Sequence, residues 1–195
     1  LCFGVLLVHR AFSVSYGKNN IYAFFGGAAL GVSFFCRFPV AFALVGVFLW
    51  IIFVNRSPIR LTSLVVLGLV LAIVLNIFLD TWFYGQLELT PVNYFTANII
   101  DGKAADFGVD PWWYYLEKLS ILLVPPFSLL TIVSIIAAIL LQPKNILTWV
   151  VVAFLLGHSI VDHKETRFLM PIMHLLLVLS IVIFGDLLTK IKIKS

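Results

Sequence analysis

Charged residues are scarce in this sequence. Asp, Glu, Lys and Arg make up only 11% of its 195 residues, whereas an average soluble domain has about a quarter. Apolar residues make up 62%, and the mean hydropathy is +1.11. This composition excludes an ordinary soluble domain and predicts an all-α, polytopic transmembrane helical bundle whose apolar surface faces lipid.

The patterns of several site types are also missing. The two cysteines, Cys2 and Cys36, lie in apolar segments without metal-ligand spacing, so we expect buried free thiols rather than a disulfide. No His, Cys and carboxylate set has zinc spacing, no glycine-rich loop precedes a helix, and no Ser-His-Asp arrangement is visible. A basic patch with interleaved aromatic residues is absent as well. We therefore expect no metal ion, no cofactor and no nucleic-acid partner.

Long apolar segments follow one another along the chain. They predict about six to seven membrane helices, at 1–14, 21–36, 40–54, 61–79, 119–141, 146–161 and 169–188. Arg37-Phe38-Pro39 separates the second segment from the third, and two short helices with a reversal are favoured there over one broken helix. About 34 apolar residues are too many for a single crossing at 1.5 Å per residue. The small residues Gly26-Gly27-Ala28-Ala29 suit close helix packing in lipid.

The chain begins in mid-helix without a methionine. We therefore interpret residues 1–195 as a single transmembrane domain fragment, the C-terminal part of a longer protein.

Basic residues are unequally distributed between the two sets of alternating loops. One set carries most of them and a single acidic residue, Asp186: Arg10, Lys18, Arg56, Arg60, Lys144, Lys190, Lys192 and Lys194. Short loops rich in Lys and Arg remain in the cytoplasm. We therefore expect Arg37, a polar outward loop at 80–118 and a charged motif at 162–171 to face the other side, the ER lumen or the periplasm.

The charged motif concentrates five ionisable groups between Asp162 and Arg167. Ionisable groups between membrane spans are expensive, which indicates a working site. Cationic side chains there, together with Arg37, suit a phosphate, and the N–H groups at the start of the last span could add to an anion site. Two alternatives stay open: Asp162 and Glu165 could simply neutralise their basic neighbours in a solvated turn, and Arg37 could extend to the lipid headgroups.

The outward loop combines carboxylates with aromatic side chains, a mixture that suits sugars. Tryptophan and tyrosine also gather at membrane interfaces in proteins of every function. Trp82 and Tyr115 fit that interfacial role, whereas the run Pro111-Trp112-Trp113-Tyr114-Tyr115-Leu116 is too dense for it alone.

These residues resemble a known family. His163-Lys164-Glu165-Thr166-Arg167-Phe168 is similar to the HKE-x-RF signature of the dolichyl-phosphate-mannose-dependent mannosyltransferases of ER N-glycan and GPI-anchor assembly, which are GT-C type, family 22-like enzymes with related bacterial proteins. Asp80–Gly85 resembles the family's D-x-x-FYG element, and Thr90–Asn98 its TP-x-N-F-x-x-N element. Phe107–Leu116 resembles FYG-x-HPW-x-WYL, with Asp110 where the family usually has His. Arg37-Phe38-Pro39 is similar to its R-P element, and the match covers roughly residues 21–175 in order.

The resemblance implies a GT-C-like fold and inverting transfer of mannose from a polyprenyl-phosphate donor to a glycan or lipid-linked acceptor, in the ER membrane or a bacterial inner membrane. Four residues would bind the donor phosphate: His163, Lys164, Arg167 and Arg37. Seven would bind the acceptor: Asp80, Tyr84, Asn93, Asn98, Asp110, Trp112 and Trp113. The family's catalytic carboxylate lies upstream of this chain, so no catalytic base is assigned.

Two other functions use similar features. A transporter or flippase for a lipid-linked or anionic substrate would also have intramembrane cations and broken helices, but it would favour charges at mid-span. A noncatalytic subunit of a membrane complex would use the polar loops for docking.

Overall fold

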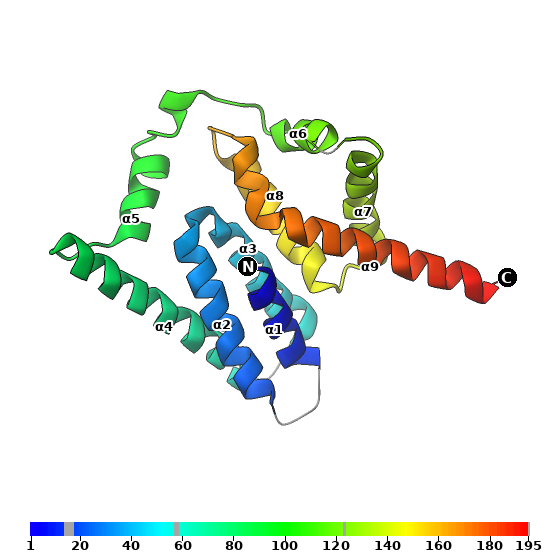
Figure 1. The fold of residues 1–195 in the computed structure, drawn as a ribbon, viewed down its shortest axis with the longest axis horizontal. Coiled ribbons are helices and arrows are strands. Elements are labelled where there is room, and N and C mark those ends of the chain that lie inside the picture. The colour runs from blue at the N-terminus through cyan, green and yellow to red at the C-terminus, as the bar shows by residue number, and fades with distance from the viewer. Residues whose placement is uncertain (14–17, 57–58, 123, 195) are drawn as a thin grey trace.

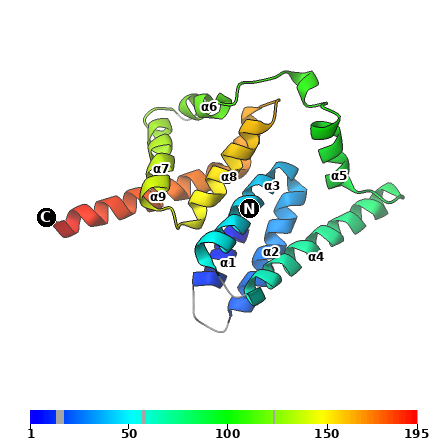
Figure 2. The same ribbon diagram turned by 180° about the vertical axis from the view of Figure 1, so that it is seen from behind.

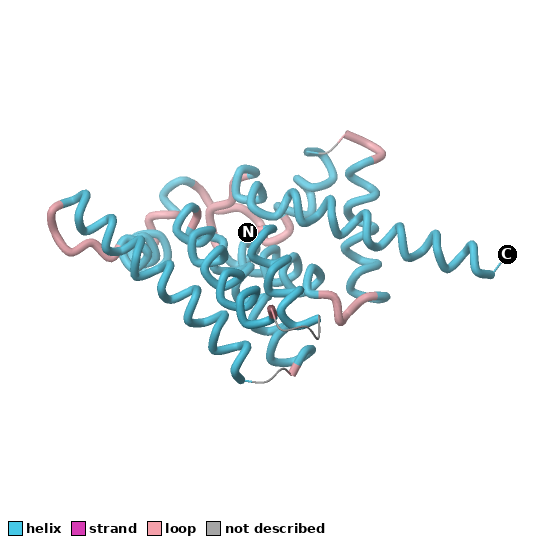
Figure 3. The backbone as a smooth tube through the Cα atoms, turned by 60° about the horizontal axis from the view of Figure 1, so that its bottom comes forward, coloured by secondary structure: helices cyan, strands magenta, loops and turns pink. Residues whose placement is uncertain are grey.

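The computed structural model describes residues 1–13, 18–56, 59–122 and 124–194, without the side chains of 122 and 190–194. Over these ranges the chain folds into helices and connecting loops, without a strand (Figure 3). The helices are α1 (Cys2–Ser13), α2 (Asn19–Cys36), α3 (Ala41–Leu49), α4 (Ile59–Tyr84), α5 (Thr90–Phe95), α6 (Tyr114–Leu122), α7 (Phe127–Leu141), α8 (Ile146–Ile160) and α9 (Met170–Lys194). The predicted all-α membrane bundle is confirmed.

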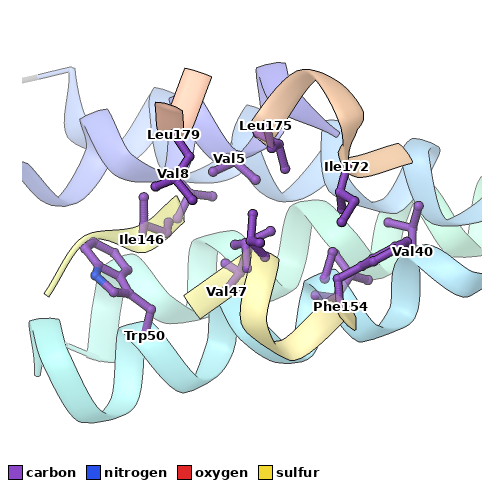
Figure 4. Close-up of a cluster of buried hydrophobic side chains, with 14 of the residues drawn as sticks. Val5, Val8, Val40, Val47, Trp50, Ile146, Phe154, Ile172, Leu175 and Leu179 are labelled. Carbon is purple, nitrogen blue, oxygen red and sulfur yellow. The ribbon is translucent and has the colours of Figure 1, made fainter. Parts of the chain in front are cut away.

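The helices pack in two connected groups. In one, α2 lies between α1 and α4; in the other, α3 packs on α8 and α7 packs on α9 (Figures 1 and 2). Figure 4 shows where the groups meet, with side chains of α1, α3, α8 and α9 in one apolar core. Val8, Val47 and Phe154 are fully buried there, so the core joins helices far apart in the sequence.

Among the residues that the structure describes, three helical segments are long and apolar enough to cross a membrane: Phe38–Asn55, Ile59–Tyr84 and Thr166–Thr189. The number rises to four if α7 and α8, which meet at an angle of 118°, form one bent span. The sequence predicted six to seven spans because it counts every apolar segment, including helices that fall short of a full crossing. Of the 26 residues of α4, only Val65, Gly68 and Ala72 are buried, and its large exposed apolar surface suits lipid.

The predicted interruption at Arg37 is confirmed. Helix α2 ends at Cys36, Arg37 is extended, and a 3₁₀ turn (Phe38–Val40) leads into α3. The chain turns back here, giving two helices rather than one (Figure 1).

The predicted continuous span at 119–141 is wrong at its start. Helix α6 already begins at Tyr114 and ends at Leu122, and α7 begins only at Phe127. Pro125 and Pro126 explain the break, because proline has no N–H to donate and disfavours helical backbone at the residue before it. Tyr114 and Tyr115 are therefore on a helix of their own.

Two basic residues that the sequence assigned to the other set of loops lie at the opposite end of the bundle from Arg37. The indole nitrogen of Trp50, just after α3, donates to the carbonyl of Lys144 at 2.8 Å, and its ring lies 6.2 Å from that of His9, next to Arg10. Arg37 lies just before the opposite end of α3. Arg10 and Lys144 therefore lie at the other end of the bundle from Arg37. The side chains of Lys190, Lys192 and Lys194 fall outside the described residues.

Glycines bring α2 and α4 into backbone contact. A Cβ added to Gly27 would lie 1.9 Å from the carbonyl oxygen of Val65, and one added to Gly68 would lie 2.0 Å from that of Phe24. Gly26 approaches α1 in the same way, 3.0 Å from the backbone nitrogen of Val8. The predicted role of the small residues at 26–29 in close helix packing is confirmed.

Gly27→Ala is expected to lower the midpoint of thermal unfolding of the purified protein in lipid nanodiscs. The added methyl group collides with backbone rather than with a flexible side chain, and overpacking of this kind costs about 1–3 kcal/mol. Gly185→Ala is the matched control, because nothing lies within 4 Å of its added Cβ. Equal midpoints for the two variants would contradict the close approach of α2 and α4.

Candidate functional site

The outward loop and the charged motif meet at Asp110. Its backbone N–H donates to the carbonyl of Asp162 at 3.0 Å, and its Oδ2 accepts the backbone N–H of Lys164 at 3.1 Å. The ring of Phe107 lies 5.8 Å from that of His163. Two segments separated by more than 50 residues are therefore joined at one end of the bundle.

Lys164 is buried at this junction and is only 4% exposed. Its ammonium group donates to the carbonyl oxygens of Val161 at 2.6 Å and Asp110 at 2.9 Å, with a longer contact to Asp162 at 3.4 Å. In the part of the chain that the structure describes, no carboxylate oxygen lies within 4.0 Å of it. The three donors of the ammonium group are therefore all directed at backbone oxygens.

A second contact attaches the loop to the motif at Tyr115. This side chain is 2% exposed, and its phenol lies near the backbone of Glu165. Burial raises the pKa of the Tyr115 phenol, so it remains a neutral hydroxyl at physiological pH. Its ring also lies 5.9 Å from that of buried His158 on α8.

Glu165 neutralises part of the motif. Its carboxylate pairs with the guanidinium of Arg167 and with Nε2 of His163 at 3.1 Å. The hydrogen bonds from Arg167 and then His163 hold the pKa of the Glu165 carboxyl below its usual value. Because the folded pKa is depressed, this pairing persists at neutral and mildly acidic pH and is lost only as the pH falls through that lowered pKa.

Arg37 and Arg167 line one open hollow of about 440 Å³. Its walls come from the α2–α3 turn, α5 and the charged motif: Phe35, Cys36, Arg37, Phe38, Pro39, Tyr94, Arg167 and Phe168. The Cζ atoms of both arginines lie 5.9 Å from the centroid of the Phe168 ring, within cation–π range. Phe38 contacts Tyr94 with ring centroids 5.0 Å apart. The hollow thus combines two cations with an aromatic wall.

Tyr94 contributes a phenol to this hollow. Burial raises the pKa of Tyr94, against the opposing effect of the nearby Arg37 charge. The group is therefore a neutral hydroxyl at physiological pH, able to donate a hydrogen bond to an anion.

The predicted acceptor-binding residues do not form one cluster. Asp110, Trp112 and Trp113 lie beside the charged motif, and Asn98 Nδ2 donates to the carbonyl of Tyr94 at 2.9 Å. Asp80 and Tyr84 lie at the end of α4, which Figure 1 shows away from the charged motif. There, Asp80 accepts a hydrogen bond from Thr90 at 2.5 Å, and Asn93 donates to Glu88. These pairs fix the start of α5 and thereby the position of Tyr94.

Sequence reasoning did not select Tyr94, Phe168 or Phe38 as site residues. Phe168 belongs to the HKE-x-RF-like motif and Phe38 follows Arg37, so both lie in segments that the sequence marked. Tyr94 lies within Thr90–Asn98. No sequence pattern indicates that these three rings line one hollow. Among the described residues, no three His, Cys, Asp or Glu side chains are grouped as metal ligands.

Comparisons with known proteins agree with this architecture. The family model of the Alg9-like mannosyltransferases matches residues 1–195. A probable Dol-P-Man:Man(7)GlcNAc(2)-PP-Dol alpha-1,6-mannosyltransferase of Schizosaccharomyces pombe is 26% identical over 170 residues, 86% of this chain and 30% of that protein. GPI mannosyltransferase 3 of Candida albicans is 28% identical over 129 residues, 66% of this chain and 25% of that protein.

GPI mannosyltransferase 3 of Trypanosoma brucei brucei is 33% identical over 129 residues, 60% of this chain and 22% of that protein. The chain thus spans less than a third of the length of these relatives. No solved structure matches it significantly. Because the family model covers the whole sequence, this chain belongs to the Alg9-like mannosyltransferase family.

Proposed function

We propose that the protein containing this chain transfers mannose from a polyprenyl-phosphate donor to a hydroxyl of a glycan or lipid-linked acceptor, with inversion. The observation that carries the proposal is the hollow that Arg37 and Arg167 line together, with Tyr94 of the outward loop in its wall. Guanidinium groups match a phosphate with paired hydrogen bonds. The hollow opens at one end of a membrane bundle, where the phosphate of a lipid-linked donor would lie.

The reaction needs positive charge where the leaving group departs. The acceptor oxygen attacks the anomeric carbon, the bond from that carbon to the phosphate oxygen breaks, and the phosphate leaves with the electron pair. Cations already in place where charge develops are the strongest stabilisers of such a step. We assign this task to Arg37 and Arg167. The acceptor proton passes to a carboxylate base, a step worth typically 10²–10⁴-fold, and we propose that this base lies in a part of the protein outside residues 1–195.

The other predicted donor ligands lie less favourably for a phosphate. His163 Nε2 faces Glu165 at 3.1 Å, and its buried Nδ1 has no hydrogen-bond partner among the described residues. We propose that His163 acts indirectly. It binds the carboxylate of Glu165 and thereby competes with the guanidinium group of Arg167 for that carboxylate. The ammonium group of Lys164 is occupied by backbone carbonyls.

The names of the relatives support the two acceptor classes that the sequence predicts. One relative is named for an oligosaccharide on a polyprenyl diphosphate and another for GPI. We propose an acceptor from one of these classes, and the ER membrane rather than a bacterial inner membrane, because these relatives come from fungi and a trypanosome. Family membership does not favour the transporter alternative.

The test uses the full-length protein in lipid nanodiscs, with a mannosyl-phosphoryl polyprenol labelled in its sugar. We expect label to move to a lipid-linked oligosaccharide or a GPI precursor, with release of polyprenyl phosphate, and no transfer from GDP-mannose. Transfer from GDP-mannose alone would refute the proposed donor. Movement of the donor across sealed vesicles without transfer to either acceptor would instead identify a flippase.

A further inference from the structure

The tryptophan pair of the outward loop is held between two attachment points. Asp110 lies just before Pro111-Trp112-Trp113-Tyr114 and is bound to Asp162 and Lys164. Tyr115 follows directly and is buried near the backbone of Glu165. Trp112 and Trp113 nevertheless remain 64% and 49% exposed. Four residues fixed at both ends thus present two large, open aromatic surfaces next to the charged motif.

Lys164 supplies most of the first attachment. Its ammonium group joins the loop, through the Asp110 carbonyl, to its own segment, through the carbonyls of Val161 and Asp162. A buried ammonium group is stable only when its donors are satisfied. Moving it onto a phosphate would break these bonds and release the loop. Its position therefore suits a connector between two segments better than an anion ligand.

Asp110 provides the loop's half of this attachment. Its backbone N–H, its carbonyl and its carboxylate are all used, by Asp162 and Lys164. The carboxylate accepts a backbone N–H and not the ammonium group, so its acceptor oxygen matters here more than its charge. An asparagine has a similar acceptor oxygen at this place, whereas an alanine has none.

We propose that Lys164 is a positioning residue that fixes Trp112 and Trp113 as an acceptor platform next to the charged motif, with Asp110 as its partner. This role rests on the proposed mannosyl transfer for its acceptor. The attachment itself concerns only the folded chain and can be measured separately.

Hydrogen exchange of the full-length protein in nanodiscs tests the attachment. In Lys164→Met, which keeps side-chain length but removes every donor, we expect amide exchange in segment 105–116 to rise at least about tenfold, because local opening there loses its main restraint. Asp106→Ala is the matched control: this carboxylate is exposed in the same loop, and no partner of it is found in the described ranges. Wild-type exchange in Lys164→Met would overturn the proposal.

The Asp110 pair is a second test that leaves the lysine in place. Asp110→Ala should speed exchange at 162–165, whereas Asp110→Asn should keep the protection of the parent protein. If the asparagine variant exchanges as fast as the alanine variant, the carboxylate acts through its charge and the proposed arrangement is wrong.

Kinetics separates positioning from direct phosphate binding. If Lys164 positions the platform, Lys164→Met raises KM for the acceptor about tenfold and leaves KM for the polyprenyl-phosphate donor near its original value. A raised donor KM with unchanged exchange would make Lys164 a phosphate ligand and overturn the proposal. Absence of mannosyl transfer in the parent protein would refute the proposed function, while the exchange results still decide whether Lys164 holds the loop.

Discussion

Arg167→Gln should lower the kcat of mannosyl transfer by about a hundredfold or more, the usual cost of removing one preorganised group that stabilises developing charge. Its side chain is 68% exposed, so glutamine costs little folding energy there. Arg37→Gln should have a similar effect, because both guanidinium groups line the same hollow. The measurement is single-turnover transfer of labelled mannose by the full-length protein.

Lysine substitutions at Arg37 and Arg167 separate the effect of the positive charge from that of the guanidinium geometry. Lysine keeps the charge but loses the planar fork that binds two phosphate oxygens, so Arg37→Lys and Arg167→Lys should retain an intermediate rate. Arg10→Gln is the control, since Arg10 is an exposed arginine at the other end of the bundle. Parental turnover in both Arg37→Gln and Arg167→Gln would remove these residues from the reaction.

Membrane class and helical breaks were predictable from sequence because each follows from local composition. Low charge and long apolar segments predict a lipid environment, and Arg37-Phe38-Pro39 places a charge and a proline between two apolar segments. The helix break at Pro125 was harder to predict from the sequence, because a proline near the start of a helix is normally tolerated. In the structure, α6 is a separate helix that buries Tyr115 and Leu119.

The sequence indicated which charged residues to consider for the candidate site, but not the contacts between them. The sequence marked Arg37 and Arg167 by charge, and the structure brings them to one hollow although they are 130 positions apart. The degree of burial then distinguishes the basic residues of the charged motif from one another. Lys164 and Arg167 look alike in the sequence, yet one is 4% exposed and the other has a 68% exposed side chain. Tertiary packing, which sequence spacing does not encode, separates the proposed connector, Lys164, from the proposed anion ligand, Arg167.

Replacing Trp112 and Trp113 together by alanine should raise KM for the acceptor by about a hundredfold, at about 1.4 kcal/mol for each ring lost. The two rings meet edge to face with centroids 5.6 Å apart, and sugars present C–H faces that fit such flat surfaces. Both side chains are largely exposed, so the double variant should fold with little loss of stability. The donor KM should stay near that of the parent protein, because the hollow does not include either tryptophan.

Trp82→Ala is the matched control for this double variant. Trp82 is 76% exposed, but it lies near the end of α4, which Figure 1 shows away from the charged motif. An interfacial tryptophan there suits the membrane boundary. We expect its acceptor KM to equal that of the parent protein. If the Trp112 and Trp113 double variant also keeps that KM, the two rings are interfacial residues like Trp82. The fixation of their segment by Lys164 and Tyr115 would then serve the fold alone, and the acceptor would have to bind elsewhere along the outward loop.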